Sequence, residues 1–427
     1  MNKRAILDLP SYELLRLKPV GHWIERFKSF TRRNPTEVAL PGVGFAGPLY
    51  DSSVHPYPEK LESSNLLPVW VHDAREGLGE GAVVWASILV ECGFLDNQSL
   101  WLRTQYGQEL EQVCLVNPVV QAILKHFVTE IIESAGVDGI VLDVTDAYPN
   151  SGAKGMTGIN GTCFCEFCKE ALKLKGFDEP VEAFIGDQGL LRFVLRVGDE
   201  GAAHIDPTQE WIDQRDARAL IAVAKSRGFV SGDTLDAEAT RLLRYFAARV
   251  QMTADCIRSV FTACRDAGKR SAVILGSADA DLSQLVTLQA LDRAKAADEY
   301  WLPDAPQRAR NSTGAQAVQF LAGRSTYMFN AFFEGVEKGD ERVLLMGPQE
   351  FLARLLNTSK TLMANQLSPG SVFTVGLLDQ YAGFAGVPFH KEDHLEVVTR
   401  LFREVTGQVL PDSILKSFQI ANPDRRA

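Results

Sequence analysis

Short apolar runs alternate with longer segments of helical period along most of this chain, and that alternation limits its folds more than any other feature. The run over 82–90 is almost continuously apolar, as expected of a parallel strand buried on both faces. Strands are predicted at Ala5–Leu9, Glu37–Leu40, Ala82–Val90, Gly139–Asp143, Ser271–Leu275, Glu299–Leu302, Ser325–Phe333 and Ser371–Leu378. Helices are predicted at Gly21–Arg33, Asn65–Glu76, Val119–Ser134, Ala237–Ala267, Ser283–Ala296, Gln349–Asn365 and Leu395–Val405. Eight strands that alternate with helices predict an α/β fold, the (β/α)8 TIM barrel.

One connection is too long for this pattern. The segment from Lys169 to about Asp236 has a helical period with glycine-rich interruptions, which indicates a mostly helical insertion after strand 4. We therefore divide the chain into a first half-barrel with strands 1–4 and a cysteine-rich loop (1–168), the insertion (169–236), a second half-barrel (237–415) and a tail (416–427).

The charge balance excludes two classes of partner. The 427 residues carry a formal net charge of −10, whereas nucleic acids and anionic membranes bind clustered Lys and Arg. No window has the ~18 apolar residues of a membrane span, and the N-terminus lacks the apolar run of a secretory signal. We expect a soluble cytoplasmic protein without a nucleic-acid or membrane partner, and the sequence leaves a homo-oligomer open.

Four cysteines have metal-like spacing. Cys163, Cys165 and Cys168 form Cys-x-Cys-x-x-Cys, and Cys114 lies 49 residues upstream in a predicted strand–helix loop. Four thiolates can close a tetrahedral zinc site with no open position, which is typical of a structural site. Reduced thiols without a metal are the alternative, and an iron–sulfur cluster of the radical type would have Cys-x3-Cys-x2-Cys spacing instead.

The segment around these cysteines resembles two groups of glycoside hydrolases. A Cys-x-x-Asn-Pro stretch, a helix, a strand and then Cys-x-Cys-x-x-Cys is similar to the family 42 β-galactosidases, which carry a four-cysteine zinc site in the same order. The strand Val137-Asp-Gly-Ile-Val-Leu-Asp143 is more similar to the hypothetical glycosyl hydrolase and α-L-fucosidase-like barrels. There, an Asp-Gly-x-x-x-Asp strand supplies the nucleophile. The resemblance covers roughly residues 35–175 and implies a structural zinc ion, with Asp143 as nucleophile.

Glycoside hydrolysis needs a second carboxyl group beside the nucleophile, and in a barrel both should follow the carboxyl ends of strands. Asp304 follows strand six, where related barrels place a carboxylate, and Glu334 follows strand seven; both are our candidates for the acid. Glu299 would lie at the wrong end of its strand. Further positional candidates are Glu91, Asp279 and Asp379, and Asp146 could bind substrate or act itself.

Aromatic side chains stack on the apolar faces of sugar rings. We expect five residues of this kind in loops at the carboxyl-end face of the barrel, namely His55, Tyr57, Tyr148, Trp301 and Tyr381. With Glu91, Asp146 and Asp379 they complete the predicted substrate-binding set.

Three functions remain open at this point. The first is a retaining hydrolase of a small glycoside, with Asp143 as nucleophile. The second is a catalytically impaired barrel that binds a carbohydrate or a partner protein. The third is another zinc-dependent hydrolase, in which one cysteine is not a ligand and water takes its place.

Overall fold

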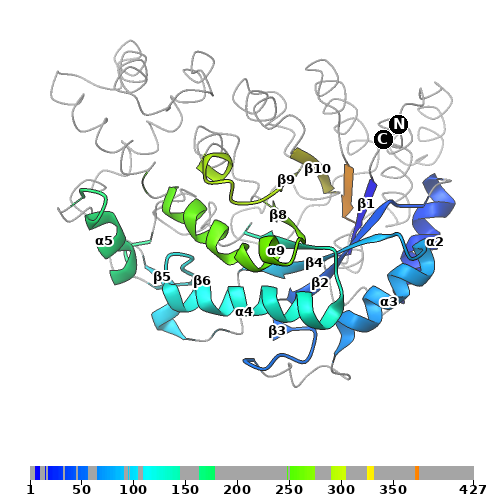
Figure 1. Cartoon of the computed structure of the whole chain (residues 1–427), viewed down its shortest axis with the longest axis horizontal. Helices are drawn as coiled ribbons and strands as arrows, with labels where there is room; N and C mark the ends of the chain where they lie inside the picture. Colours follow the sequence, from blue (N-terminus) through cyan, green and yellow to red (C-terminus); the bar gives the residue numbers. More distant parts are fainter. Residues whose placement is uncertain are drawn as a thin grey trace, which may run out of the picture.

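A computed structural model of the chain describes parts of both predicted half-barrels (Figure 1). The described residues are 5–9, 15, 18–31, 34–44, 47–55, 65–90, 95, 97–103, 109–144, 163–177, 248, 251–274, 290–303, 325–330 and 371–374. The predicted insertion is described only through Phe177, and the predicted tail over 416–427 lies outside the described residues.

A curled sheet of parallel strands forms the centre of the molecule. Its order is β1-β11-β10-β9-β8-β7-β4-β2-β3, and β1 also pairs with β2. Every pairing in it is parallel except that of β2 with the short β3. The strands are β1 (Ala5–Asp8), β2 (Glu37–Gly44), β3 (Gly47–Pro48), β4 (Val83–Leu89), β7 (Gly139–Asp143), β8 (Arg270–Ile274), β9 (Glu299–Pro303), β10 (Ser325–Asn330) and β11 (Ser371–Thr374).

All eight predicted strands are confirmed. The bounds of β7 are those predicted, and the predicted ends of three strands, at Leu275, Phe333 and Leu378, lie outside the described residues. The largest change is in β2, which continues through Pro41 to Gly44 instead of ending at Leu40. The pairing of β2 with β4 shifts register between Pro41 and Val43, and such an irregularity is where a strand accommodates a proline. A hairpin of β5 (Trp101–Arg103) and β6 (Glu109–Val113) was not predicted, because its short strands have no apolar run.

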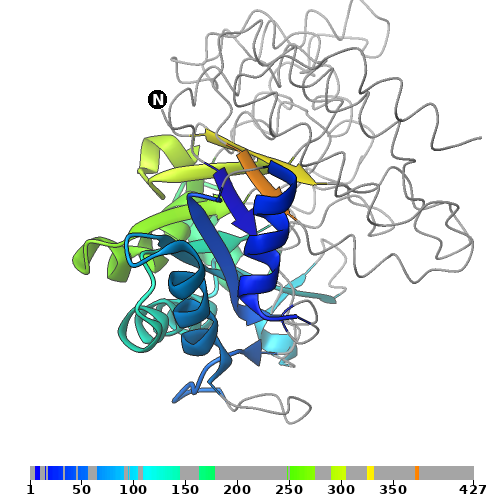
Figure 2. The same cartoon turned by 90° about the vertical axis from the view of Figure 1, so that its right-hand side faces the viewer.

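Helices pack side by side on the outer face of the sheet. The helices α2 (Val20–Thr31), α3 (Leu66–Leu78), α4 (Pro118–Ala135) and α9 (Thr262–Asp266) each contact the next one (Figures 1 and 2). The buried side of α4 is apolar, with Leu124, Phe127 and Ile131 in its middle. Burial of such side chains against the strands contributes about 1.5–3 kcal/mol each. Part of the predicted long helix is described, with helical backbone over 251–260 before α9.

Local sequence signals fix both ends of α4. The side chain of Asn117 caps the helix by accepting a hydrogen bond from the Val119 N–H at 2.9 Å, and Pro118 occupies the first turn. Gly136 ends the helix with φ 66°, a left-handed conformation that glycine adopts without steric cost. The Asn-Pro pair of the cysteine segment is therefore a helix start.

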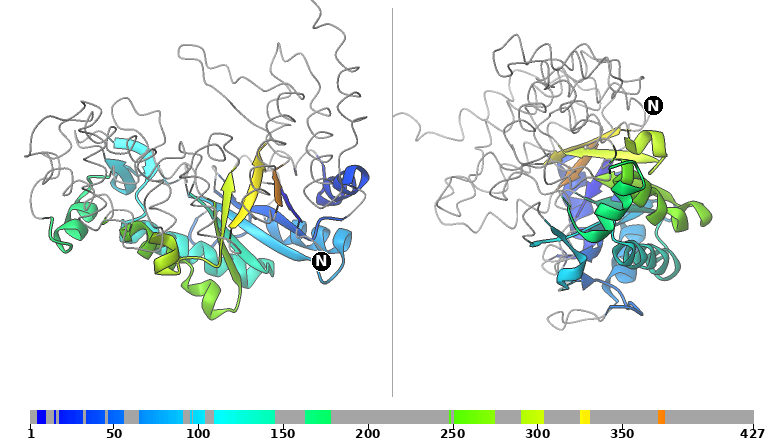
Figure 3. Two further views of the ribbon diagram at one scale, coloured as in Figure 1. Left: turned by 90° about the horizontal axis from the view of Figure 1, so that it is seen from above. Right: turned by 90° about the vertical axis from the view of Figure 1, so that its left-hand side faces the viewer.

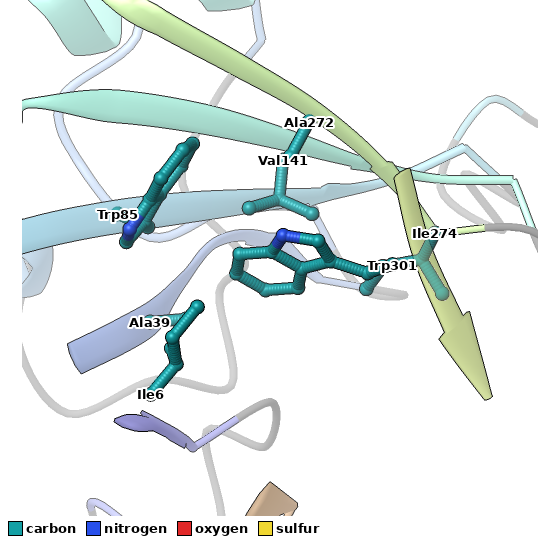
Figure 4. Packing of buried hydrophobic residues seen from close by; sticks show 7 residues of the cluster. All are labelled: Ile6, Ala39, Trp85, Val141, Ala272, Ile274 and Trp301. Atoms are coloured by element: carbon teal, nitrogen blue, oxygen red, sulfur yellow. The ribbon is translucent and has the colours of Figure 1, made fainter. Parts of the chain in front are cut away.

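The inner face of the sheet carries its own apolar cluster. Trp85 and Trp301 lie edge to face with ring centroids 5.4 Å apart, and Figure 4 shows smaller side chains converging on them from other strands. The cluster consists of Ile6, Ala39, Trp85, Val141, Ala272, Ile274 and Trp301. The interior of the curl is thus filled by side chains from six strands.

Trp301 corrects one prediction. It is the third residue of β9 and is fully buried in the inner cluster, rather than standing in a loop at the carboxyl-end face. A run as short as Glu299–Leu302 fits either face of a strand, so the sequence could not show that the indole points inward.

Charged residues lie at the amino ends of three strands, on the same inner face. Arg270 begins β8 and pairs with Glu37 of β2 at 3.5 Å and with Glu299 of β9. Its guanidinium lies 4.5 Å from the centroid of the Trp85 ring, and the Trp85 indole N–H donates to Glu37 at 2.6 Å. We call Arg270, Glu37, Glu299 and Trp85 the amino-end network. As predicted, Glu299 lies at the amino end of its strand, where it is the first residue of β9.

Among the described residues, none of the helices combines the length and apolar character needed to cross a bilayer.

Candidate functional site

Asp143 ends β7 at the carboxyl edge of the sheet. Its neighbours in register are Leu89 of β4 and Ile274 of β8, and its side chain is half-buried. Side chains two residues apart on a strand share a face, so Asp143 faces the interior together with Val141 of the inner cluster. This is where parallel-sheet enzymes carry functional groups, and it agrees with the position predicted for the nucleophile.

The other two fixed residues of the Asp-Gly-x-x-x-Asp motif have structural tasks. Asp138 accepts hydrogen bonds from the Val84 N–H at 3.0 Å and from Arg75 at 3.3 Å, which ties β7 to β4 and α3. Gly139 faces the Trp85 ring so closely that a Cβ would collide with the ring carbons. Asp138 and Gly139 therefore anchor the start of the strand, and Asp143 is the member of the motif at its carboxyl end.

The four predicted metal ligands come together. The Sγ atoms of Cys114, Cys163, Cys165 and Cys168 all lie within 4.8 Å of one another, and all four side chains are buried. Cys114 Sγ is 3.4 Å from Cys168 Sγ and 3.7 Å from Cys165 Sγ. A tetrahedral zinc ion with Zn–S bonds of ~2.3 Å requires S···S distances of about 3.8 Å. The thiol positions fit such an ion.

Three segments position these cysteines. Cys114 follows the β5–β6 hairpin, and its N–H donates to the Leu100 carbonyl at 2.8 Å. The Phe164 N–H donates to the Arg103 carbonyl of β5 at 2.8 Å. Cys165 and Cys168 lie at the start of α5 (Glu166–Lys173). Figure 3 shows α5 and the hairpin at the end of the described structure away from α2. The cluster therefore joins the hairpin, α4 and α5.

The four thiols affect one another's ionisation. Hydrogen bonding with Cys163 and the other thiols, together with burial, raises the pKa of Cys114. Hydrogen bonds from Cys114 and Cys163 lower the pKa of Cys165. A buried set of four thiols has few uses for its polar atoms without a metal, because thiols are weak hydrogen-bond partners.

His55 lies in a loop as predicted; this loop follows the short β3 and packs against α4. The His55 ring centroid is 5.4 Å from that of Phe127, and burial lowers the pKa of His55. Earlier in the loop, Ser52 Oγ and the Ser53 N–H donate to the Glu130 carboxylate at 2.7 and 2.6 Å. The structure thus places His55 beside the helical layer and does not bring it together with Asp143.

A serine, a histidine and a glutamate meet in this loop without forming a catalytic triad. His126 Nε2 is 2.9 Å from Ser53 Oγ and also 2.9 Å from Glu130 Oε1. A triad uses one ring nitrogen for the serine and the other for the carboxylate. Here the same nitrogen serves both, so the arrangement anchors the loop.

The remaining predicted site residues lie outside the described residues. They are the acid candidates Asp304 and Glu334 and the substrate-binding candidates Tyr57, Glu91, Asp146, Tyr148, Asp379 and Tyr381. Their roles stay predictions.

The sequence patterns did not predict the buried carboxylate of Asp8 as a site residue. Asp8 is the last residue of β1 and only 2% exposed. An Asp at the end of a buried apolar run was the available signal, since aspartate is rarely buried without a specific partner.

Comparison with solved structures supports the fold. The catalytic domain of β-amylase from Paenibacillus polymyxa is similar with a TM-score of 0.50 and 8% identity, over 95% of this chain and 99% of that one. The α-L-fucosidase isoenzyme 2 from Paenibacillus thiaminolyticus gives a TM-score of 0.47 and 14% identity over 95% of this chain. This chain spans about half (49%) of that fucosidase chain.

Sequence comparison adds no family. No protein-family model matches the chain, and no curated protein matches it. At 8% identity the β-amylase likeness concerns the fold alone.

Proposed function

We propose that the chain is a glycoside hydrolase that acts on a small glycoside with retention of configuration. The observation that carries the proposal is Asp143, a half-buried carboxylate on the inner face of a curled parallel sheet, at its carboxyl end. The solved structure that is similar with a TM-score of 0.50 is the catalytic domain of a β-amylase, which is compatible with a carbohydrate substrate. A neutral carbohydrate also suits a chain with a formal net charge of −10.

The scaffold of this enzyme would be a complete (β/α)8 barrel with a helical insertion after the fourth parallel strand. The strand registers support closure. Followed from Asp8 through Ala39, Trp85 and Gly139 and onward around the sheet, they return to β1 displaced by eight residues, and shear 8 is the value of a TIM barrel. The division of the chain at 168, 236 and 415 belongs to this proposal.

In the proposed mechanism a carboxylate oxygen of Asp143 attacks the anomeric carbon as the glycosidic bond breaks, and a carboxylic acid protonates the leaving oxygen. Water then hydrolyses the glycosyl-enzyme ester, assisted by the same acid in its ionised form. Asp304 and Glu334 are the candidates that the sequence offers for the acid.

Zinc is the metal we propose for the four cysteines. Cys114, Cys163, Cys165 and Cys168 would hold it, and with four thiolate ligands it supplies a cross-link rather than a reactive position. The same closed ligand set disfavours a zinc hydrolase, which keeps one position open for water.

The test is hydrolysis of a panel of aryl glycosides by the wild-type chain and by Asp143→Asn. We expect activity on at least one sugar, and a loss of about 10³-fold or more in Asp143→Asn, because the amide is a poor nucleophile. An Asp143→Gly variant supplied with azide should form a glycosyl azide of inverted configuration.

Asp138→Asn is the matched control. It changes the other aspartate of the motif, which lies at the amino end, so it should lower stability while keeping turnover in the folded fraction. A wild type inactive on every sugar that still binds one in calorimetry would replace the hydrolase proposal by the carbohydrate-binding one.

A further inference from the structure

Among the described residues, two strands of the curled sheet end in a carboxylate. The last residues of β1 and β7 are Asp8 and Asp143, whereas the last described residues of the other parallel strands are Gly44, Leu89, Ile274, Pro303, Asn330 and Thr374. Within the described part of these strands, Asp8 is therefore the end residue that can complement Asp143 as a second carboxyl group.

Both carboxylates belong to the inner face. Ile6 points into the inner cluster beside Trp301 (Figure 4), and Asp8 follows it by two residues on the same strand. Val141 and Asp143 have the same relation on β7. Because side chains alternate between the faces of a strand, Asp8 and Asp143 lie on the side of the sheet that encloses the apolar cluster.

The two strands are separated by a distance that suits a sugar ring. In the sheet order β1, β2, β4, β7, three inter-strand steps of about 4.8 Å each put the strands at most about 14 Å apart. The register leads from Asp8 through Ala39 and Trp85 to Gly139, four residues before Asp143. Because strands in an eight-stranded barrel are staggered by about one residue per strand, three steps offset about three of these four residues, and the two aspartates lie at similar heights along the barrel axis. Inward-facing side chains on a curled sheet lie closer than that. A ring bound between them can contact both carboxyl groups, as glycoside hydrolysis requires.

The two groups differ in their surroundings. Asp8 is 2% exposed, whereas Asp143 is half-buried. Glycosidases assign the proton-donating role to a carboxyl group kept in a sheltered site and the nucleophilic role to one in a more polar site. The difference in burial therefore favours Asp8 as the proton donor and Asp143 as the nucleophile.

We propose that Asp8 is the catalytic acid and base of this site, an inference that rests on the proposed hydrolase function. In the first step Asp143 bonds to the anomeric carbon, the bond to the leaving oxygen breaks, and the Asp8 proton moves to that oxygen. In the second step Asp8, now a carboxylate, takes a proton from water as the water oxygen bonds to the anomeric carbon and the bond to Asp143 breaks. Both aspartates end in their starting protonation states.

Leaving-group dependence in Asp8→Ala tests this role. Phenyl glycosides need protonation of the leaving oxygen, and dinitrophenyl glycosides do not. We expect Asp8→Ala to lower kcat/KM for the phenyl glycoside by about 10²–10⁴-fold and for the dinitrophenyl glycoside by less than about 10-fold. Azide should accelerate the variant and give a glycosyl azide of retained configuration. The alkaline limb of the pH–rate profile should disappear.

Asp304→Ala and Glu334→Ala provide the comparison, and Asp8→Asn preserves side-chain shape if Asp8→Ala does not fold. An equal loss for both leaving groups in the Asp8 variants overturns the proposal while the hydrolase function stands. So does a leaving-group-dependent loss in Asp304→Ala or Glu334→Ala alone. A wild type inactive on every glycoside overturns the hydrolase function itself.

Discussion

At the scale of single residues, Gly139 shows how the motif of β7 is tied to packing. The Trp85 ring occupies the space where a Cβ would lie. The ring cannot easily withdraw, because its N–H is bonded to Glu37 and Arg270 lies over its face. The glycine of Asp-Gly-x-x-x-Asp is therefore required by a tryptophan from another strand.

Gly139→Ala should lower the free energy of unfolding by about 1–3 kcal/mol, the usual cost of overpacking a dense core. Urea denaturation measures it. Gly44→Ala is the control, since a Cβ at Gly44 meets nothing within 4 Å. Equal effects of the two substitutions would contradict the explanation.

Glu130 gives the stability of the protein a defined pH dependence. Burial disfavours its charge, but hydrogen bonds from the Ser53 N–H, Ser52, the Ser53 hydroxyl and His126 outweigh burial and lower the pKa of Glu130 from 4.5 to about 2. A carboxyl group with a lowered pKa stabilises the fold above its unfolded pKa, and the contribution is lost as pH falls through the folded pKa.

Glu130→Gln should therefore cost about 1.5–3 kcal/mol at neutral pH, the range of hydrogen bonds to a charged group. The difference from wild type should shrink between pH 4.5 and about 2. Thermal melts across this range test it, with Glu133→Gln, an exposed glutamate on α4, as control. A difference that stays constant with pH would exclude this role of the charge.

At the scale of elements, the strands and helices with a clear apolar period could be predicted from the sequence. Features that depend on contacts between segments remote in sequence could not. Apolar runs predicted each of the eight parallel strands, and cysteine spacing predicted the four cysteines that come together. The orientation of Trp301 and the docking of the His55 loop on α4 depend on neighbours remote in sequence. The β5–β6 hairpin had no apolar period, yet it helps to hold the cysteine cluster.

The four-cysteine cluster should stabilise the junction of the β5–β6 hairpin, α4 and α5 when it binds zinc as proposed. Cys165→Ser should reduce bound zinc from one ion per chain to a small fraction, measured by plasma emission spectroscopy, and should lower the melting temperature because metal binding is coupled to folding. Cys264→Ser, a buried cysteine of α9 outside the cluster, is the control and should keep its zinc. Unchanged zinc content in Cys165→Ser would refute the four-thiolate site.

At the scale of the whole molecule, the amino-end network connects the two predicted half-barrels. Arg270 from one half pairs with Glu37 from the other. Glu37 and Glu299 are nearly buried, at 7% and 12% side-chain exposure, so loss of the cation would leave two carboxylates facing each other in the interior.

Arg270→Met should destabilise the fold by about 1–3 kcal/mol, because it leaves two nearly buried carboxylates without their partner, while Arg270 itself is 38% exposed and solvent weakens the pairs. Adding Glu37→Gln and Glu299→Gln should recover part of that loss, since no charge then remains unpaired. Chemical denaturation of the single and triple variants gives both values. A triple variant less stable than Arg270→Met would contradict this account.

The cysteine cluster and the amino-end network can form at different times during synthesis of the chain. All four cysteines of the cluster lie within residues 114–168, so the proposed zinc ion could bind to the nascent chain once Cys168 has left the ribosome. The amino-end network must wait for Glu299. The availability of metal in the cell would thus affect an early folding step of this chain, whereas the ion pairs of the amino-end network would form in a late one.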